Sequence, residues 1–262
     1  MVLPAAEQPP EPPPDAYLVR MKNLTSTALS TALTAGLLAA AAPAALADDG
    51  ASMTPDAALQ KLMDGNARFV AGELEHPNLS KEVRETLAQG QNPYAVIVGC
   101  ADSRVPPELL FDAGPGDLFV IRVAGNVVDD FEQASIEYAV AVLETPLVVV
   151  LGHESCGAVD AAVKAERGEA SFEGHIHDLV EEIRESVESA MDKPYEGDLL
   201  DAAVAENANR VKHQLTRSQP YVGPAVEDGK VKLVAARYDL DTGEVTRVDE
   251  HDKDGMDGHD HD

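Results

Sequence analysis

Residues 94–104 read YAVIVGCADSR, an unbroken apolar run that ends in a cysteine, an acid and a base. Branched apolar residues without alternation are typical of a strand that is buried on both faces. Two similar runs follow, LFVIRV at 118–123 and LVVVL at 147–151. We therefore expect three buried strands, and strands of this kind belong to parallel sheets with helices on both faces.

Stretches with apolar residues at helical spacing surround these runs. Thr54, Pro55 and Asp56 form a helix start, with an N-cap residue, a first-turn proline and an acid near the positive end of the helix dipole. Strands that alternate with helices predict right-handed crossovers between parallel neighbours. The expected helices cover residues 54–71, 81–88, 131–143, 158–167, 176–191 and 199–217.

Two further apolar runs, at 231–238 and 244–248, flank the turn signal Asp239-Leu-Asp-Thr-Gly243. A turn of this composition between two strand-like runs predicts a hairpin at the margin of the sheet. The expected fold class is therefore α/β, with a mainly parallel central β-sheet flanked by helices and a C-terminal antiparallel edge hairpin.

Residues 21–47 resemble an export leader. Met21 and Lys22 precede an apolar stretch at 28–42 and the sequence Ala45-Leu-Ala47, which is the pattern of a signal peptide with an A-x-A cleavage site. The stretch is alanine-rich and Pro43 interrupts the run, so a membrane span is disfavoured. We expect a periplasmic or secreted protein without membrane insertion after cleavage. The expected segments are an upstream extension or mis-assigned start at 1–20, the signal peptide at 21–47, one domain at 48–249 and a disordered acidic, His-rich tail at 250–262.

The chain is strongly acidic, with 47 acidic and 20 basic residues and a formal net charge of −27. Residues 1–47 contain two basic and three acidic residues, so the 215 residues after cleavage would carry −26. This charge disfavours binding to nucleic-acid phosphates. Self-repulsion of the charges falls as salt screens it, so we favour a saline medium outside the cell as the working environment. An ordinary acidic surface is the alternative.

Cysteine and histidine residues stand where the strands are expected to end. Cys100 follows the first run directly, His153 stands two positions after the third, and Cys156 begins the next helix. Ligands collect at the carboxyl ends of parallel strands, and a helix N-terminus favours a thiolate. Two thiolates and an imidazole are typical of a zinc site with a fourth position left for water. Two cysteines in an exported protein would by context alone suggest a disulfide, but this placement favours the metal.

Asp102 and Arg104 follow the first of these ligands closely. Arg104 can hold the Asp102 carboxylate through a two-pronged hydrogen bond. The carboxylate can then accept a hydrogen bond from zinc-bound hydroxide and orient that oxygen, and without Arg104 it could instead bind the zinc. A salt bridge that only tightens the turn is the alternative for Arg104.

The motifs CADSR and GHESCG resemble the C-x-D-S-R and H-x-x-C signatures of beta-class carbonic anhydrases, and the similarity extends from about Leu59 to Val248. The resemblance implies a catalytic domain at 48–249 that interconverts carbon dioxide and bicarbonate. It also implies a homodimer or higher even oligomer, with a substrate pocket at the interface that is lined partly by the partner chain. The implied zinc ligands, one ion per chain, are Cys100, His153 and Cys156, the implied catalytic dyad is Asp102 and Arg104, and the implied pocket residues are Gln91, Phe119, Tyr138 and Gly157.

One subgroup of that family has a regulatory bicarbonate pocket that contains a tryptophan. This chain has no tryptophan, so we expect an open, water-bound zinc and not one capped by Asp102. Two other functions stay open at this point. A related zinc hydrolase could act on carbonyl sulfide or carbon disulfide, and a non-enzymatic periplasmic protein could bind zinc through the histidines at 251, 259 and 261.

Overall fold

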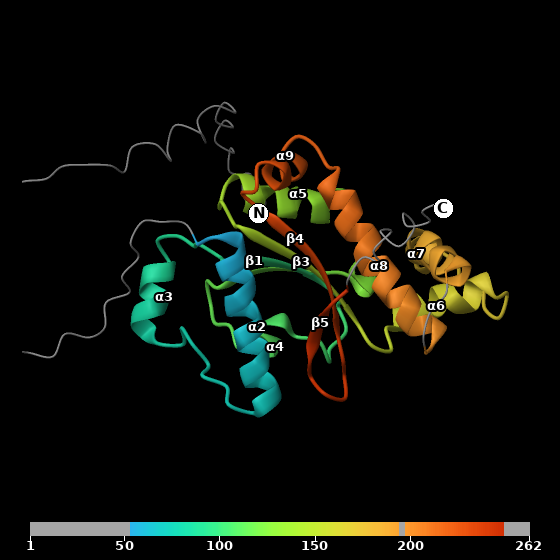
Figure 1. Ribbon diagram of the computed structural model, residues 1–262, viewed down its shortest axis with the longest axis horizontal. Coiled ribbons are helices and arrows are strands. Elements are labelled where there is room, and N and C mark those ends of the chain that lie inside the picture. Colours follow the sequence, from blue (N-terminus) through green and yellow to red (C-terminus); the bar gives the residue numbers. More distant parts are fainter. Residues whose placement is uncertain (1–52, 194–196, 249–262) are drawn as a thin grey trace, which may run out of the picture. The chain divides into compact units, whose positions relative to one another are not determined.

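Figure 1 shows the computed structural model, which describes residues 53–193 and 197–248 around one five-stranded sheet. The strand order is β2-β1-β3-β4-β5, in which the first four strands run parallel and β5 pairs antiparallel with β4. The α/β fold class with an antiparallel edge hairpin is thereby confirmed. The strands are β1 (Ala95–Gly99), β2 (Leu118–Arg122), β3 (Leu147–His153), β4 (Lys232–Tyr238) and β5 (Val245–Arg247).

Helices pack on both faces of the sheet, which explains why β1 and β3 are buried along their whole length. Ile97 and Val149 face one side, where they share a core with α2 and α4. Val98 and Val150 face the other side, together with α8 and residues of α5 and α9. The helices of the described residues are α2 (Pro55–Ala71), α3 (Lys81–Leu87), α4 (Pro107–Leu110), α5 (Asp130–Ala141), α6 (Gly157–Glu166), α7 (His175–Asp192), α8 (Leu199–Thr216) and α9 (Val222–Glu227).

Local capping signals set most of the helix boundaries. The Thr54 hydroxyl accepts the Ala57 amide at 3.2 Å, and Gly72, with φ 73°, ends α2 as predicted. Helix α5 begins one residue earlier than predicted because Asp129 is its N-cap and forms a capping box with Glu132. The short elements α4, α9 and the 3-10 turn η1 (Ala124–Asn126) were not predicted, since they are too short to show helical periodicity.

The two strands of the C-terminal hairpin, β4 and β5, join the sheet through β4. Its first strand, β4, runs parallel to β3, and only β5 is antiparallel to its neighbour. The turn between them is held by Asp239, whose Oδ1 accepts the amides of Asp241 and Thr242 at 3.1 and 2.9 Å. Helix α8 precedes β4 and contacts both β3 and β4.

A third layer forms where α6 and α7 pack beside α8 (Figure 1). Helix α8 approaches β3 very closely at Gly152. A Cβ atom at this position would lie 2.9 Å from Val204 Cγ1 and 3.4 Å from the Val204 carbonyl oxygen, so only glycine fits without movement. This close approach fixes the distance between α8 and the strand that carries His153.

Several predictions concern residues outside the described ranges. They are the upstream extension at 1–20, the signal peptide at 21–47, the His-rich tail at 250–262 and the outermost positions of the predicted domain. Within residues 53–193 and 197–248, no helix has both the length and the apolar character needed to cross a bilayer. The signal peptide and the disordered tail stay predictions, because both lie outside these ranges.

Candidate metal centre

Three buried donor side chains meet at the carboxyl end of the central strands. Cys100 follows β1, His153 is the last residue of β3, and Cys156 is the N-cap residue of α6. Because β1 and β3 are adjacent and parallel, their ends lie side by side. The ligand atoms of the three residues all lie within 4.8 Å of one another, and both cysteines are free thiols. The structure thus brings together the residues predicted as metal ligands.

The two thiols cannot easily lose both protons on their own. A hydrogen bond from the Cys156 thiol lowers the pKa of Cys100 to about 4. The same contact, together with burial, raises the pKa of Cys156 well above its ordinary value. One proton is therefore shared between the two sulfur atoms, and a second thiolate needs a cation beside it. A divalent metal ion would supply that charge, and zinc is the ion that such thiolate and imidazole sets favour.

His153 is oriented as a metal ligand would be. Its side chain is fully buried, and Nδ1 lies 2.8 Å from the carbonyl oxygen of Glu154. This contact favours the tautomer that donates from Nδ1 and leaves a lone pair on Nε2. Within the described residues Nε2 has no hydrogen-bond partner. A buried nitrogen of this kind fits a metal ion well.

The Asp102 carboxylate faces the cluster and is fixed by Arg104. Arg104 donates from Nε and from its backbone amide to Asp102 Oδ1, both at 2.9 Å, and from Nη2 to Oδ2 at 2.7 Å. These bonds hold the pKa of the Asp102 carboxyl well below its usual range. Oδ2 lies 3.9 Å from His153 Nε2, which is beyond hydrogen-bond reach. Arg104 Nη2 also contacts the Ser155 carbonyl oxygen at 3.3 Å, so the pair spans both loops that carry ligands.

Residues of β2 and η1 form further hydrogen bonds to the loop that follows β1, and these hydrogen bonds were not predicted. Arg122 donates from Nε to the Cys100 carbonyl oxygen at 2.9 Å and from Nη2 to the Asp102 carbonyl oxygen. The Gly125 amide lies 3.3 Å from Cys100 Sγ. Asn207 of α8 in turn donates to the Gly125 carbonyl oxygen. A basic residue at the end of an apolar, strand-like run, and an asparagine on the apolar stripe of α8, were the available sequence signals.

The predicted pocket residues fall into two groups. Gly157, the first residue of α6, adjoins Cys156 and is exposed. Phe119 and Tyr138 lie together, with ring centroids 6.3 Å apart. They are not at the cluster of their own chain, because Phe119 pairs with Val96, four residues or about 13 Å before Cys100. The exposed Gln91 precedes β1 and so also lies toward its amino end.

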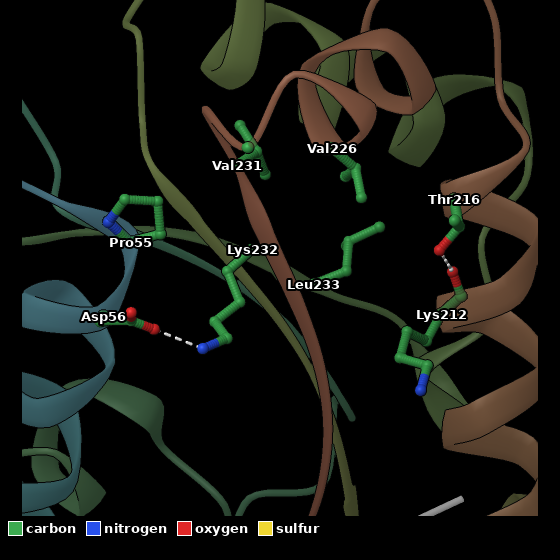
Figure 2. A pocket seen from close by; sticks show the side chains of 9 residues that line it. Pro55, Asp56, Lys212, Thr216, Val226, Val231, Lys232 and Leu233 are labelled. Atoms are coloured by element: carbon green, nitrogen blue, oxygen red, sulfur yellow. Dashed lines mark hydrogen bonds and ion pairs between the residues drawn. The ribbon is translucent and has the colours of Figure 1, made fainter.

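A hollow at the amino end of β4 is separate from the metal cluster. It is lined by residues of α2, α8, α9 and the start of β4 (Figure 2). Lys232 points toward α2 there and forms an ion pair with Asp56. Since the parallel strands carry the cluster at their carboxyl ends, this hollow lies at the opposite end of the sheet and contributes nothing to the donor set.

The family of the chain is established by three comparisons. Residues 95–245 match the family model described as carbonic anhydrase. A carbonic anhydrase of Mycolicibacterium smegmatis is 43% identical over 192 residues, which cover 73% of this chain and 92% of that protein. Carbonic anhydrase 2 of Mycobacterium tuberculosis is 42% identical over 195 residues, 74% of this chain and 93% of the relative.

Comparison with solved structures leads to the same family. The beta-carbonic anhydrase CcaA has a TM-score of 0.57 and 30% identity, covering 73% of this chain and 95% of its own. A Coccomyxa beta-carbonic anhydrase in complex with acetazolamide has a TM-score of 0.55 and 27% identity, covering 72% and 85%. The chain therefore belongs to the beta-carbonic anhydrase family of enzymes, which confirms the resemblance found in its sequence.

Proposed function

We propose that the chain catalyses the reversible hydration of carbon dioxide to bicarbonate and a proton, at one zinc ion held by Cys100, His153 and Cys156. The observation that carries this proposal is the meeting of two buried thiols with an imidazole nitrogen that has no hydrogen-bond partner in the described part of the chain, beside a fixed carboxylate. A bound zinc ion would lower the pKa of a water molecule, as it does in carbonic anhydrases with histidine ligands. Two thiolates would make the zinc shell formally neutral and so lower that pKa less, which would shift activity toward alkaline pH.

Asp102 would orient the reacting water. Its carboxylate stays ionised because its pKa is lowered, so its oxygens act only as hydrogen-bond acceptors. Arg104 holds both oxygens, so the carboxylate can turn toward a metal only by breaking charge-assisted hydrogen bonds. This geometry supports an open site in which Asp102 accepts a hydrogen bond from the water, and it disfavours a site capped by Asp102.

A second chain would complete the substrate pocket. We define the β2–α5 face as Phe119, Phe131, Tyr138 and Val142, of which Phe131 is 87% exposed and Val142 47%. Strand β2 is at an edge of the sheet and, unlike β1 and β3, is only partly buried. Edge strands with exposed apolar neighbours favour association. Two chains that pair through this face would bring Phe119 and Tyr138 of one chain toward the cluster of the other.

The central test is stopped-flow carbon dioxide hydration on protein of known zinc content. We expect activity in proportion to zinc, up to one ion per chain, and inhibition by acetazolamide. Parallel assays with carbonyl sulfide and carbon disulfide test the hydrolase alternative, and a faster reaction with either substrate would overturn the assignment of carbon dioxide. Deletion of residues 249–262 should leave one tightly held zinc and full activity. Loss of that zinc on deletion would instead favour a tail-based zinc-binding protein.

Export is also part of the proposal, on the strength of the leader pattern at 21–47. Expression of the full chain in a Gram-negative host, followed by N-terminal sequencing of the periplasmic protein, should give a mature chain that starts at Asp48. A protein that stays in the cytoplasm and retains residues 21–47 would contradict the export.

A further inference from the structure

Asn207 is a polar residue in an apolar position. Its side chain is fully buried in α8, between the buried residues Val204, Ala208 and Val211 of the same helix. A buried amide destabilises a fold unless hydrogen bonds satisfy it. The partners of Asn207 therefore indicate what the residue does.

The orientation of the Asn207 amide is determined by its neighbours on α7 and α8. Arg210 Nε donates to Ser186 Oγ at 3.1 Å, and a guanidinium nitrogen can only donate. The Ser186 hydroxyl proton is then available for Asn207 Oδ1, which lies 3.1 Å away. Nδ2 of Asn207 consequently faces the Gly125 carbonyl oxygen and donates to it at 2.7 Å.

Gly125 links this network to the metal centre. Its amide lies 3.3 Å from Cys100 Sγ, and its backbone has φ 70°, a left-handed conformation that favours glycine. A Cβ atom here would lie 2.7 Å from Ile183 Cδ1 and 3.2 Å from Ala158 Cβ, so a larger residue would also have to displace the Ile183 side chain. Gly125 is thus held through its carbonyl by Asn207 while its amide points at the sulfur of a ligand.

We propose that Asn207 is a positioning residue for the metal centre, acting through Gly125 on the Cys100 sulfur. By fixing Gly125, it keeps an N–H directed at the Cys100 thiolate, which orients the sulfur and withdraws part of its charge. Contacts of this kind around metal ligands typically change metal affinity by about 10- to 100-fold when removed. This role rests on the proposed metal site, and its failure can be separated from a failure of that site.

Asn66 offers a matched control on the other face of the sheet. It is also buried, at 4% exposure, and it also bridges distant backbone segments. Its Nδ2 donates to the carbonyl oxygens of Leu110 and Gly243, and its Oδ1 accepts the Val245 amide at 2.9 Å. None of these partners is a donor of the metal cluster. Asn66→Ala should therefore cost stability without affecting the metal.

The experiment uses the full chain loaded with cobalt(II), whose thiolate charge-transfer band in the near ultraviolet reports on the sulfur ligands. Zinc affinity is measured separately by competition with a chromophoric chelator. Asn207→Leu is close in size to asparagine but has no donor for Gly125, and Asn207→Ala removes the amide together with most of the side chain. We expect both variants to shift the cobalt band and to weaken zinc binding about 10-fold or more. Asn66→Ala should lower the melting temperature and leave both metal readouts unchanged.

Asn207 variants that are less stable but keep the wild-type cobalt band and zinc affinity would overturn the proposal and leave a purely structural residue. Where neither variant folds, Ser186→Ala decides, because it removes the hydroxyl that orients the amide. A shifted band in that variant supports the proposal and an unchanged band overturns it. A wild-type chain that binds neither cobalt nor zinc would overturn the proposed metal site as well, which distinguishes the two failures.

Discussion

The metal cluster and the β2–α5 face differ in how much of what they need lies within one chain. Each donor of the cluster is buried and oriented by contacts of its own chain, as Cys100 is by the Gly125 amide. The β2–α5 face leaves Phe131 87% exposed, and its ring pair, Phe119 and Tyr138, lies about 13 Å along the strand from the cluster. Under the proposed function, one chain would therefore suffice to bind the metal ion, whereas the substrate pocket would need two chains.

The largest effect should come from removing a donor. Cys156→Ser should lose both zinc and activity, because a serine hydroxyl is not ionised near neutral pH and cannot replace a thiolate. Zinc per chain, measured by atomic emission, should fall from about one to near zero, and hydration should fall to the uncatalysed rate. Full zinc occupancy in this variant would show that the ligand assignment is wrong, and with it the self-contained cluster.

Asp102→Asn should separate metal binding from catalysis within one chain. The amide fills the same space but lacks the charge and one of the acceptor oxygens, so zinc should stay bound while hydration falls by about 100-fold or more. Zinc content and stopped-flow rate are measured on the same sample. Wild-type rates at full zinc content would reduce the Asp102–Arg104 pair to a structural salt bridge.

Phe131→Asp tests the other half of the comparison. A charge on an exposed helix position should not unfold the chain, but it should oppose pairing through the β2–α5 face. We expect a halved molar mass by light scattering, unchanged zinc content and activity reduced about 10-fold or more. Ile176→Asp, on an exposed position of α7, is the control and should leave mass and activity unchanged. A fully active monomer would contradict the shared pocket.

The parts of the fold that could be predicted are those with a local sequence signal. The buried runs of β1 and β3, the helix starts and the hairpin turn each depend on a few adjacent residues. The expectation that residues 118–123 are buried as well is wrong, because β2 lies at the edge of the sheet and is only partly buried. The donor cluster could be predicted because strand ends meet at one edge of a sheet. The parallel pairing of β4 with β3 could not be predicted in this way, because it depends on how α8 crosses the sheet. The contact of Asn207 with Gly125 joins residues 82 positions apart, so no local pattern could indicate it.

The smallest effect should come from salt. The net charge of −27 opposes both folding and pairing, and its range falls from about 30 Å at 0.01 M salt to about 10 Å at 0.1 M. Between low and moderate sodium chloride concentrations the melting temperature should rise by about 5 °C, which corresponds to about 2 kcal/mol in the free energy of unfolding. Higher salt should change it little further. Zinc affinity should respond least, because the cluster is buried. Melting temperature and activity that are flat from millimolar to molar salt would show that the acidity is ordinary surface composition.

The close approach of α8 to β3 at Gly152 makes the metal centre sensitive to volume as well as to chemistry. Gly152 adjoins His153 on the strand, and Val204, which it contacts, lies one helical turn before Asn207 on α8. A methyl group at position 152 would lie only 2.9 Å from Val204 Cγ1, so α8 and β3 would have to move apart. That movement would separate His153 on β3 from Asn207 on α8, which holds Gly125 beside Cys100. Gly152→Ala adds no charge and removes no donor of the cluster, yet we expect it to weaken metal binding by changing the spacing between β3 and α8.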